Sequence, residues 1–185
     1  MRPLRPILGF AALAAFAWLS AAPPARALPR IDRGFQAFLD GDYKAALKGL
    51  APLARDGYAK AQYDLGSLYD NGAGVARDEA AAARWYRRAA DQGNLLAEDR
   101  LGQMYARGLG VKRNLERAYF WFEEAAFQAN GKLQNQIENE RYRVVMEMTP
   151  TELMAAMHMT VGWQPTRRAR SPQAFAKSET RALDG

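Results

Sequence analysis

The stretch LGSLYDNGAGV, residues 65–75, has the apolar spacing of a helix and yet carries a glycine inside it. Leu65, Leu68 and Tyr69 lie at helical intervals, whereas Gly66 interrupts the pattern. An isolated glycine in a helix interior costs roughly 1 kcal/mol relative to alanine. Gly66 therefore needs a structural reason, and so does the glycine-rich loop NGAG at residues 71–74.

The same arrangement returns 36 residues later as LGQMYARGLGV, residues 101–111. Displacement by 36 aligns Leu65 with Leu101, Gly66 with Gly102, Tyr69 with Tyr105, Gly72 with Gly108, Gly74 with Gly110 and Trp85 with Trp121. A fixed period of 20 to 50 residues is typical of a solenoid built from stacked helical units. The opposite displacement aligns Asp78 with Asp42 and Gly93 with Gly57, but residues 31–39 match poorly. We interpret this earlier unit as a divergent capping repeat.

Each full unit is predicted to be a pair of antiparallel helices. The first helix covers roughly residues 60–70 and is closed by Asn71-Gly72, because glycine readily takes the left-handed conformation after a helix end. The second helix begins after the N-cap residue Asp78, and Asn114 and Asp42 are predicted to cap the equivalent helices.

Gly66 and Gly102 are predicted to let the two helices of a unit approach closely. We expect the aromatic side chain of Trp85 or Trp121 to fill the remaining space, so that packing offsets the cost in helix propensity.

After residue 131 the period is lost, and two further helices are expected. Residues 133–148 read as a helix that offers Ile137, Tyr142, Val144 and Val145 for packing. Thr149-Pro150-Thr151-Glu152 is a strong helix start, with an N-cap threonine, a proline at the first helical position and glutamate three residues after the cap. This last helix is expected to end at Gly162, and both helices are interpreted as a cap on the last repeat.

Four methionines lie in these two predicted helices: Met148, Met154, Met157 and Met159. We interpret them as gap-filling core residues, and the alternative is an adaptable binding face.

The first residues are expected to be a secretory signal peptide. Arg2 and Arg5 precede an apolar run at residues 7–20, and Ala25-Arg26-Ala27 fits a small-x-small cleavage site. An uncleaved anchor is the alternative, but the run is shorter than the ~20 residues of a membrane span. We therefore expect cleavage after Ala27, a periplasmic or secreted location, and no membrane span in the mature chain.

The formal net charge of +6 arises at the two ends of the chain. Between residues 28 and 165, Lys and Arg equal Asp and Glu in number, whereas residues 166–185 carry the basic run RRAR and no apolar pattern. A neutral folded part has no electrostatic footprint for nucleic acid. The tail is predicted to be disordered.

These residues also carry a family resemblance. Residues 61–93 follow the pattern A-x-x-x-L-G-x-x-Y-x-x-G-x-G-V-x-x-D-x-x-x-A-x-x-W-Y-x-x-A-A-x-Q-G, and residues 97–129 follow it with small departures. This pattern closely resembles the Sel-one-like repeat, a relative of the tetratricopeptide repeat. The resemblance implies an all-α fold, a right-handed superhelix of antiparallel helix pairs, whose usual role is to hold other proteins together.

We accordingly divide the chain into six segments: a signal peptide at 1–27, a divergent repeat at 28–58, full repeats at 59–94 and 95–131, capping helices at 132–165 and a basic tail at 166–185.

The sequence offers little for catalysis. It contains one histidine, His158, and no cysteine, which excludes a zinc site of usual composition and a cysteine–histidine pair. Glu123 and Glu124 are adjacent on a predicted helix, so they point in different directions and cannot work alone as an acid/base pair. We predict no catalytic residue, no metal site and no cofactor.

The favoured function is a protein-interaction scaffold that binds another protein or peptide on the concave face of the solenoid. By helical phase and by analogy with tetratricopeptide repeats, the exposed residues there are Tyr63, Ser67, Asp70, Asp99, Gln103 and Arg107. One alternative is an envelope polymer or anionic surface bound through the basic tail. Another is a hydrolase acting on cell-wall or β-lactam substrates.

Overall fold

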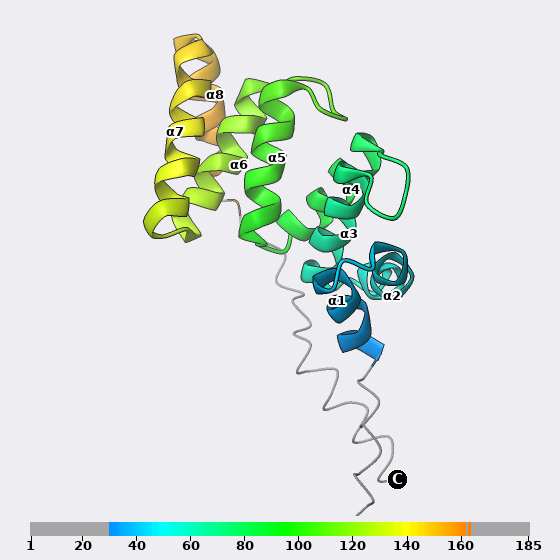
Figure 1. The fold of residues 1–185 in the computed structure, drawn as a ribbon. Coiled ribbons are helices and arrows are strands. Elements are labelled where there is room, and N and C mark those ends of the chain that lie inside the picture. Colours follow the sequence, from blue (N-terminus) through cyan, green and yellow to red (C-terminus); the bar gives the residue numbers. More distant parts are fainter. Residues whose placement is uncertain (1–29, 162, 164–185) are drawn as a thin grey trace, which may run out of the picture.

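The computed structural model describes residues 30–161 and 163, and these form eight α-helices (Figure 1). Their bounds are α1 Arg30–Leu39, α2 Tyr43–Arg55, α3 Ala59–Asn71, α4 Glu79–Ala90, α5 Leu95–Arg107, α6 Leu115–Gln128, α7 Gly131–Glu147 and α8 Pro150–Thr160. The predicted signal peptide and the predicted tail lie outside the described residues. No helix in the described part is long and apolar enough to cross a bilayer.

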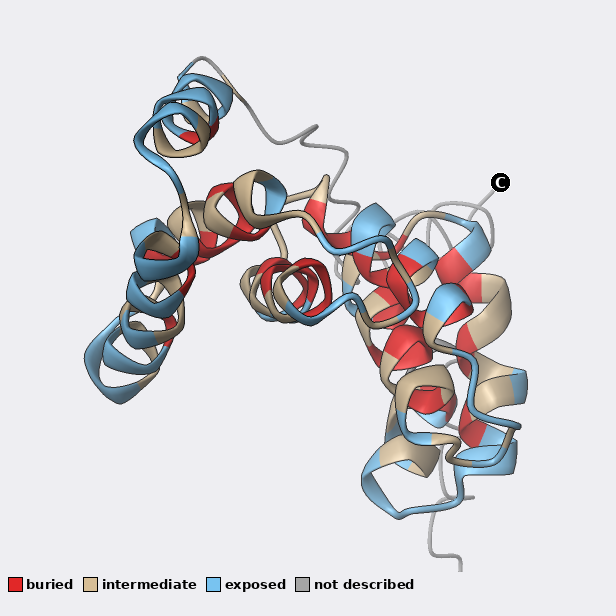
Figure 2. Ribbon diagram, turned by 90° about the horizontal axis from the view of Figure 1, so that it is seen from above, coloured by how far each residue is buried: buried red, intermediate tan, exposed pale blue. Residues whose placement is uncertain are grey.

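The helices are arranged as consecutive packed pairs. Helices α1 and α2, α3 and α4, and α5 and α6 pair with one another, and each pair stacks on the next through α2–α3 and α4–α5 contacts. The described part therefore curves as an arc, with buried residues concentrated between the helices (Figure 2). This arrangement confirms the predicted solenoid of helix pairs.

Local sequence signals begin and end these helices as expected. The side chains of Asp42, Asp78 and Asn114 accept hydrogen bonds from backbone N–H groups three residues later, at 3.1, 2.8 and 2.7 Å. Gly72 and Gly108 close α3 and α5 in the left-handed conformation, with φ of +66° and +75°. The predicted N-caps and glycine turns are confirmed.

In the two full repeats, the glycine within the first helix faces an aromatic ring, but a different ring from the expected one. A Cβ atom on Gly66 would lie 2.8 Å from the ring of Tyr86, and one on Gly102 would lie 2.7 Å from the ring of Phe122. The expectation that Trp85 or Trp121 fills this space is wrong. Neighbouring residues on a helix are rotated by about 100°, so the residue after each tryptophan is the one that faces the glycine.

Gly66→Leu should lower the melting temperature of the protein by several degrees. The added side chain must displace Tyr86, which is buried, and overpacking of this kind costs roughly 1–3 kcal/mol. Ser67→Leu places the same side chain on the next, partly exposed position of α3 and is the matched control. Thermal unfolding followed by circular dichroism measures both variants. An unchanged transition in Gly66→Leu would mean that the Tyr86 ring moves aside without cost.

The first helix pair differs from the others in its connection. Three residues separate α1 from α2, whereas seven separate α3 from α4. With this shorter loop, Gly34 takes the place of Gly66, and it meets the backbone of Gly49 on α2. The poor match of residues 31–39 at a displacement of 36 therefore reflects a shift in register as well as divergent side chains.

At the other end, α7 and α8 both pack against α6, as expected for a cap. Thr149 and Glu152 form the predicted capping box, with Pro150 in the first turn. Ile137 and Val144 are buried, but Tyr142 is 63% exposed and does not pack as predicted. Helix α7 buries only a narrow stripe against α6, and Tyr142 lies outside it.

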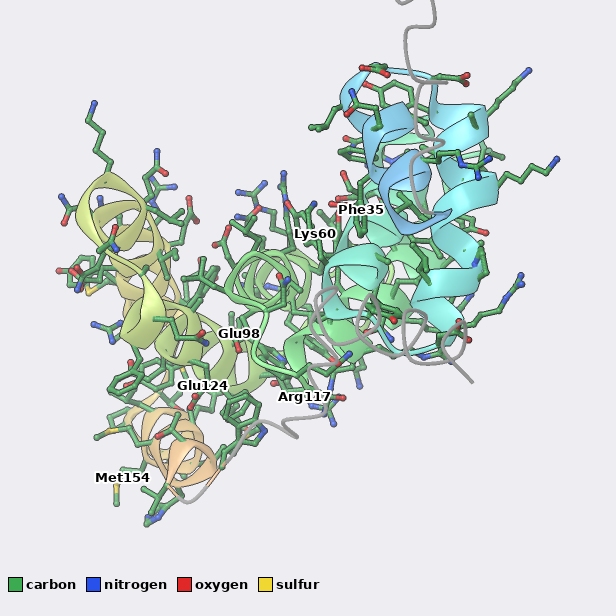
Figure 3. All side chains as sticks on the ribbon, turned by 90° about the horizontal axis from the view of Figure 1, so that it is seen from below. Phe35, Lys60, Glu98, Arg117, Glu124 and Met154 are labelled. Atoms are coloured by element: carbon green, nitrogen blue, oxygen red, sulfur yellow. The ribbon has the colours of Figure 1, made fainter. Side chains whose placement is uncertain are left out.

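The interpretation of the methionines as core residues is wrong for three of the four. Met154 is 62% exposed, Met157 and Met159 are also exposed, and only Met148 is partly buried against the core. Figure 3 shows Met154 directed away from the helices. The reason is that α8 uses the buried Ala156 for its contact with α6, which leaves the methionines on its other sides.

Candidate functional site

Two adjoining cavities lie along the exposed side of α5. The first, of about 360 Å³, is formed between α5 and α7, and the second, of about 330 Å³, lies between α5 and the C-terminal end of α3 with its following loop. Gln103 and Arg107 line both cavities, so the two form one continuous depression. We call it the α5 groove.

Side chains from three consecutive odd-numbered helices line this groove. From α5 come Asp99, Arg100, Gln103 and Arg107; from α3 and its loop come Asp70, Asn71 and Arg77; from α7 come Gln136, Asn139, Glu140 and Arg143. The period of 36 residues places α3 and α5 in equivalent positions, and α7 continues the row although its sequence has left the pattern.

Four of the six residues predicted for partner binding come together here. Asp70, Asp99, Gln103 and Arg107 line the α5 groove. The other two do not line either of its cavities: Tyr63 is partly buried with its ring 5.6 Å from that of Tyr86, and the hydroxyl of Ser67 accepts a hydrogen bond from Asn71.

The sequence reasoning missed the contribution of α7 to the groove. Gln136, Asn139, Glu140 and Arg143 lie beyond the last repeat, so no periodic signal marks them. Arg100 was also missed, because adjacent residues on a helix are rotated by about 100° and only Asp99 was assigned to the exposed face.

A chain of hydrogen bonds organises the centre of the groove. Arg100 donates to the Gln103 side-chain oxygen at 3.2 Å, and the Gln103 amide nitrogen donates to Asp99 at 3.0 Å. Burial raises the pKa of Asp99 above its usual value, and the hydrogen bond from Gln103 opposes this rise. Gln103 is therefore held by its two neighbours at the point where the two cavities join.

A third cavity, of about 290 Å³, lies where the last residues of the described part meet α6. Trp163 packs edge-on against Phe120 and Trp121, with ring centroids 5.4 and 5.7 Å apart. The same cavity is lined by Arg87, whose guanidinium lies 5.1 Å from the Trp121 ring centroid. Residues 164–185 continue from this point outside the described residues.

None of the residues considered above for catalysis, Glu123, Glu124 and His158, lines the α5 groove. Glu123 pairs with Arg141 on α7. His158 is exposed on α8. Within residues 30–161 and 163 no three potential metal-ligating side chains of His, Cys, Asp or Glu gather in one place.

A completely buried acid on α5 was not anticipated from the sequence. Glu98 on α5 is completely buried, and Figure 3 shows it next to Glu124 on α6. The amide nitrogen of Gln128 donates to its Oε2 at 2.8 Å, whereas its Oε1 has no hydrogen-bond partner. Burial, assisted by the charge of Glu124, raises the pKa of Glu98 to about 7 against the bond from Gln128.

The preceding repeat carries an amide where Glu98 carries an acid. At the equivalent position Gln62 accepts a hydrogen bond from Gln92 at 2.7 Å and donates one to the Ala54 carbonyl at 3.0 Å. The displacement of 36 aligns Gln62 with Glu98 and Gln92 with Gln128. The sequence could have revealed this exchange, but it does not show that the position is buried.

The fold defines a class of protein, the helical-repeat solenoids. The family model of the Sel1 repeat matches residues 59–94 and 95–129 of this chain. A solved Sel1 repeat protein from Oxalobacter formigenes is 33% identical, with a TM-score of 0.53, over 60% of this chain and 86% of that one. This chain therefore belongs to the Sel1 repeat family.

Two further proteins that resemble this chain are longer than it is. The structure of c5321, a protective antigen of uropathogenic Escherichia coli strains with an SLR fold, is 29% identical with a TM-score of 0.64, over 82% of this chain and 32% of that one. Chitin synthase regulatory factor 3 of Schizosaccharomyces pombe is 49% identical over 51 residues, which are 28% of this chain and 5% of that protein. The chain spans less than a third of either protein's length.

Proposed function

We propose that this protein is an exported, non-catalytic scaffold that binds a segment of another protein in the α5 groove. The observation that carries the proposal is the groove itself: two adjoining cavities share Gln103 and Arg107 and are lined from three helices in a row. Sel1 repeats generally mediate protein interactions. The extended inner surface of a solenoid suits such contacts because it offers many side chains to one partner.

Export is the second part of the proposal. It rests on the basic start, the apolar run at residues 7–20 and the cleavage pattern that ends at Ala27. The protein recovered from its native cells should begin at Leu28, and an intact mass measurement tests this.

Site-specific crosslinking in native cells tests the groove. A photoreactive residue at Asn139, on the α7 side of the groove, should capture one defined protein, and Arg107→Ala in the same chain should reduce the capture. The matched control is the same photoreactive residue at Arg84, an exposed position of α4 outside both cavities of the groove. Equal capture at the two positions, or no capture at Asn139, would contradict binding in the groove.

A further inference from the structure

The walls of the α5 groove favour a peptide over a small organic ligand. Small-molecule sites are lined mostly by apolar and aromatic side chains. The cavity between α5 and α7 contains one aliphatic residue, Leu133, among seven polar or charged ones. The cavity between α3 and α5 is lined by two apolar residues, Met104 and Leu109, and by six polar or charged ones. Such polar walls match the many hydrogen-bonding groups of a polypeptide backbone.

The end of the groove next to α3 is basic. Arg77, Arg100 and Arg107 line it, against the single acid Asp70. Arg77 is already paired with Glu79 at 2.6 Å. In the described part of the chain, neither Arg100 nor Arg107 takes part in an ion pair, and both are exposed. Guanidinium groups bind carboxylates through paired N–H donors, so this end is complementary to an acidic group.

Arg100 and Arg107 are placed to act on the same ligand. They are seven residues apart on α5, which is two turns and about 10 Å along the helix axis. Two turns bring both side chains to the same face, and Gln103 lies between them. The bond from Arg100 to the neutral Gln103 positions the guanidinium without neutralising its charge.

The end of the groove next to α7 is balanced in charge. Asp99 and Glu140 balance Arg107 and Arg143 there, and Arg143 is bonded to Glu140 at 3.1 Å. On α7, Gln136 and Asn139 are exposed and three residues apart, so they lie on the same side. An amide side chain both donates and accepts hydrogen bonds, as a peptide backbone does.

We propose that the α5 groove binds an extended peptide segment whose acidic group lies at the Arg100 and Arg107 end and whose backbone runs toward Gln136 and Asn139. This inference rests on the function proposed above and adds the chemistry of the partner. The acidic group is an Asp or Glu side chain or a C-terminal carboxylate, since all three present the same anion to a guanidinium. A basic segment is disfavoured, because its charge would meet two unpaired arginines.

A phage-displayed library of random 12-residue peptides tests the proposal with the full mature chain as the target. The selected peptides should be enriched in Asp and Glu, and Arg107→Gln should weaken the binding of a selected synthetic peptide about tenfold or more. Arg84→Gln, on α4 outside the groove, is the matched control and should leave its affinity unchanged. Arg107→Glu should turn the selection toward Lys- and Arg-bearing peptides.

Because Arg100 and Arg107 are exposed, their variants should keep the melting temperature of the parent, which separates lost binding from lost folding. Selected peptides without acidic residues, or acidic peptides that bind the Arg107→Glu chain equally well, would overturn the inference. Either result would leave the crosslinking at Asn139 intact. Failure of that crosslinking would instead overturn the proposed function.

Discussion

Glu98→Gln should stabilise the folded protein at pH 8 by up to about 3 kcal/mol. Glu98 is completely buried and its pKa is raised to about 7 from the ordinary value of 4.5, and each unit of pKa corresponds to 1.36 kcal/mol. The uncharged amide avoids the cost of a buried carboxylate beside Glu124. It also restores the arrangement of the preceding repeat, where Gln62 bonds both Gln92 and the Ala54 carbonyl.

The same variant should flatten the dependence of stability on pH. Below pH 4.5 the Glu98 carboxyl is protonated in both the folded and the unfolded chain, so its contribution to stability is fully present. Between pH 4.5 and 7 the unfolded chain releases this proton and the folded chain keeps it. Stability therefore falls as pH rises, and the loss is complete above pH 7.

Urea unfolding at several pH values between 4 and 8.5 measures this effect. The difference in unfolding free energy between Glu98→Gln and the parent should be small at pH 4 and greatest above pH 7. Glu116→Gln, in the first turn of α6, is the control and should not show the stabilisation above pH 7. A constant difference across the range would mean that Glu98 does not carry the titration.

Gly110→Ala should destabilise the protein by about 3 kcal/mol or more and weaken the coupling between repeats. Gly110 has φ of +64°, and a Cβ atom there would collide with the carbonyl carbon and oxygen of Glu79. Those atoms belong to the first turn of α4, so the backbone itself has to move. The expected cost combines left-handed strain of about 1–2 kcal/mol with the overpacking of the contact.

Gly57→Ala separates these two contributions. Gly57 also has a positive φ, of +95°, but a Cβ atom there meets nothing within 4 Å, so only the strain remains. Chemical unfolding of the two variants gives the difference between them. In a repeat protein the interfaces between neighbours hold the units together, so the Gly110→Ala transition should also broaden. Equal losses in both variants would show that the loop adjusts freely against α4.

The Gly110 contact explains why the loop after the first helix of each full repeat has two glycines. Gly108 turns the chain at the end of α5, whereas Gly110 lets the loop lie against the preceding repeat. In the unit before it, Gly74 meets the backbone of Tyr43 at the start of α2 in the same way. The sequence predicts the turn from Gly108, but the contact of Gly110 joins residues of different repeats.

The lining of the α5 groove could be predicted only in part, because it also depends on contacts between different helix pairs. Asp70, Asp99, Gln103 and Arg107 follow from helical phase together with the analogy to tetratricopeptide repeats, which indicates the side of the first helix that lines the concave face. The α7 residues follow from no pattern, since their place depends on how α7 packs against α6.

By itself the sequence determined the features that depend on near neighbours in the chain. These are the helices of the 36-residue period, the N-caps such as Asp78, the left-handed closing glycines and the capping box at Thr149. Each is a hydrogen bond or backbone conformation made within a few residues, so local chemistry suffices to specify it.

Only the tertiary structure decided which side chains meet between helices and between repeats. It placed Tyr86 and not Trp85 against Gly66, buried Glu98 where Gln62 stands one repeat earlier, and left Met154 exposed. These outcomes depend on the rotation and offset of one helix against another. The 36-residue period indicates that the same packing geometry recurs from unit to unit, but it does not give the rotation or the offset of the helices. The residues that pack against one another are therefore known only from the tertiary structure.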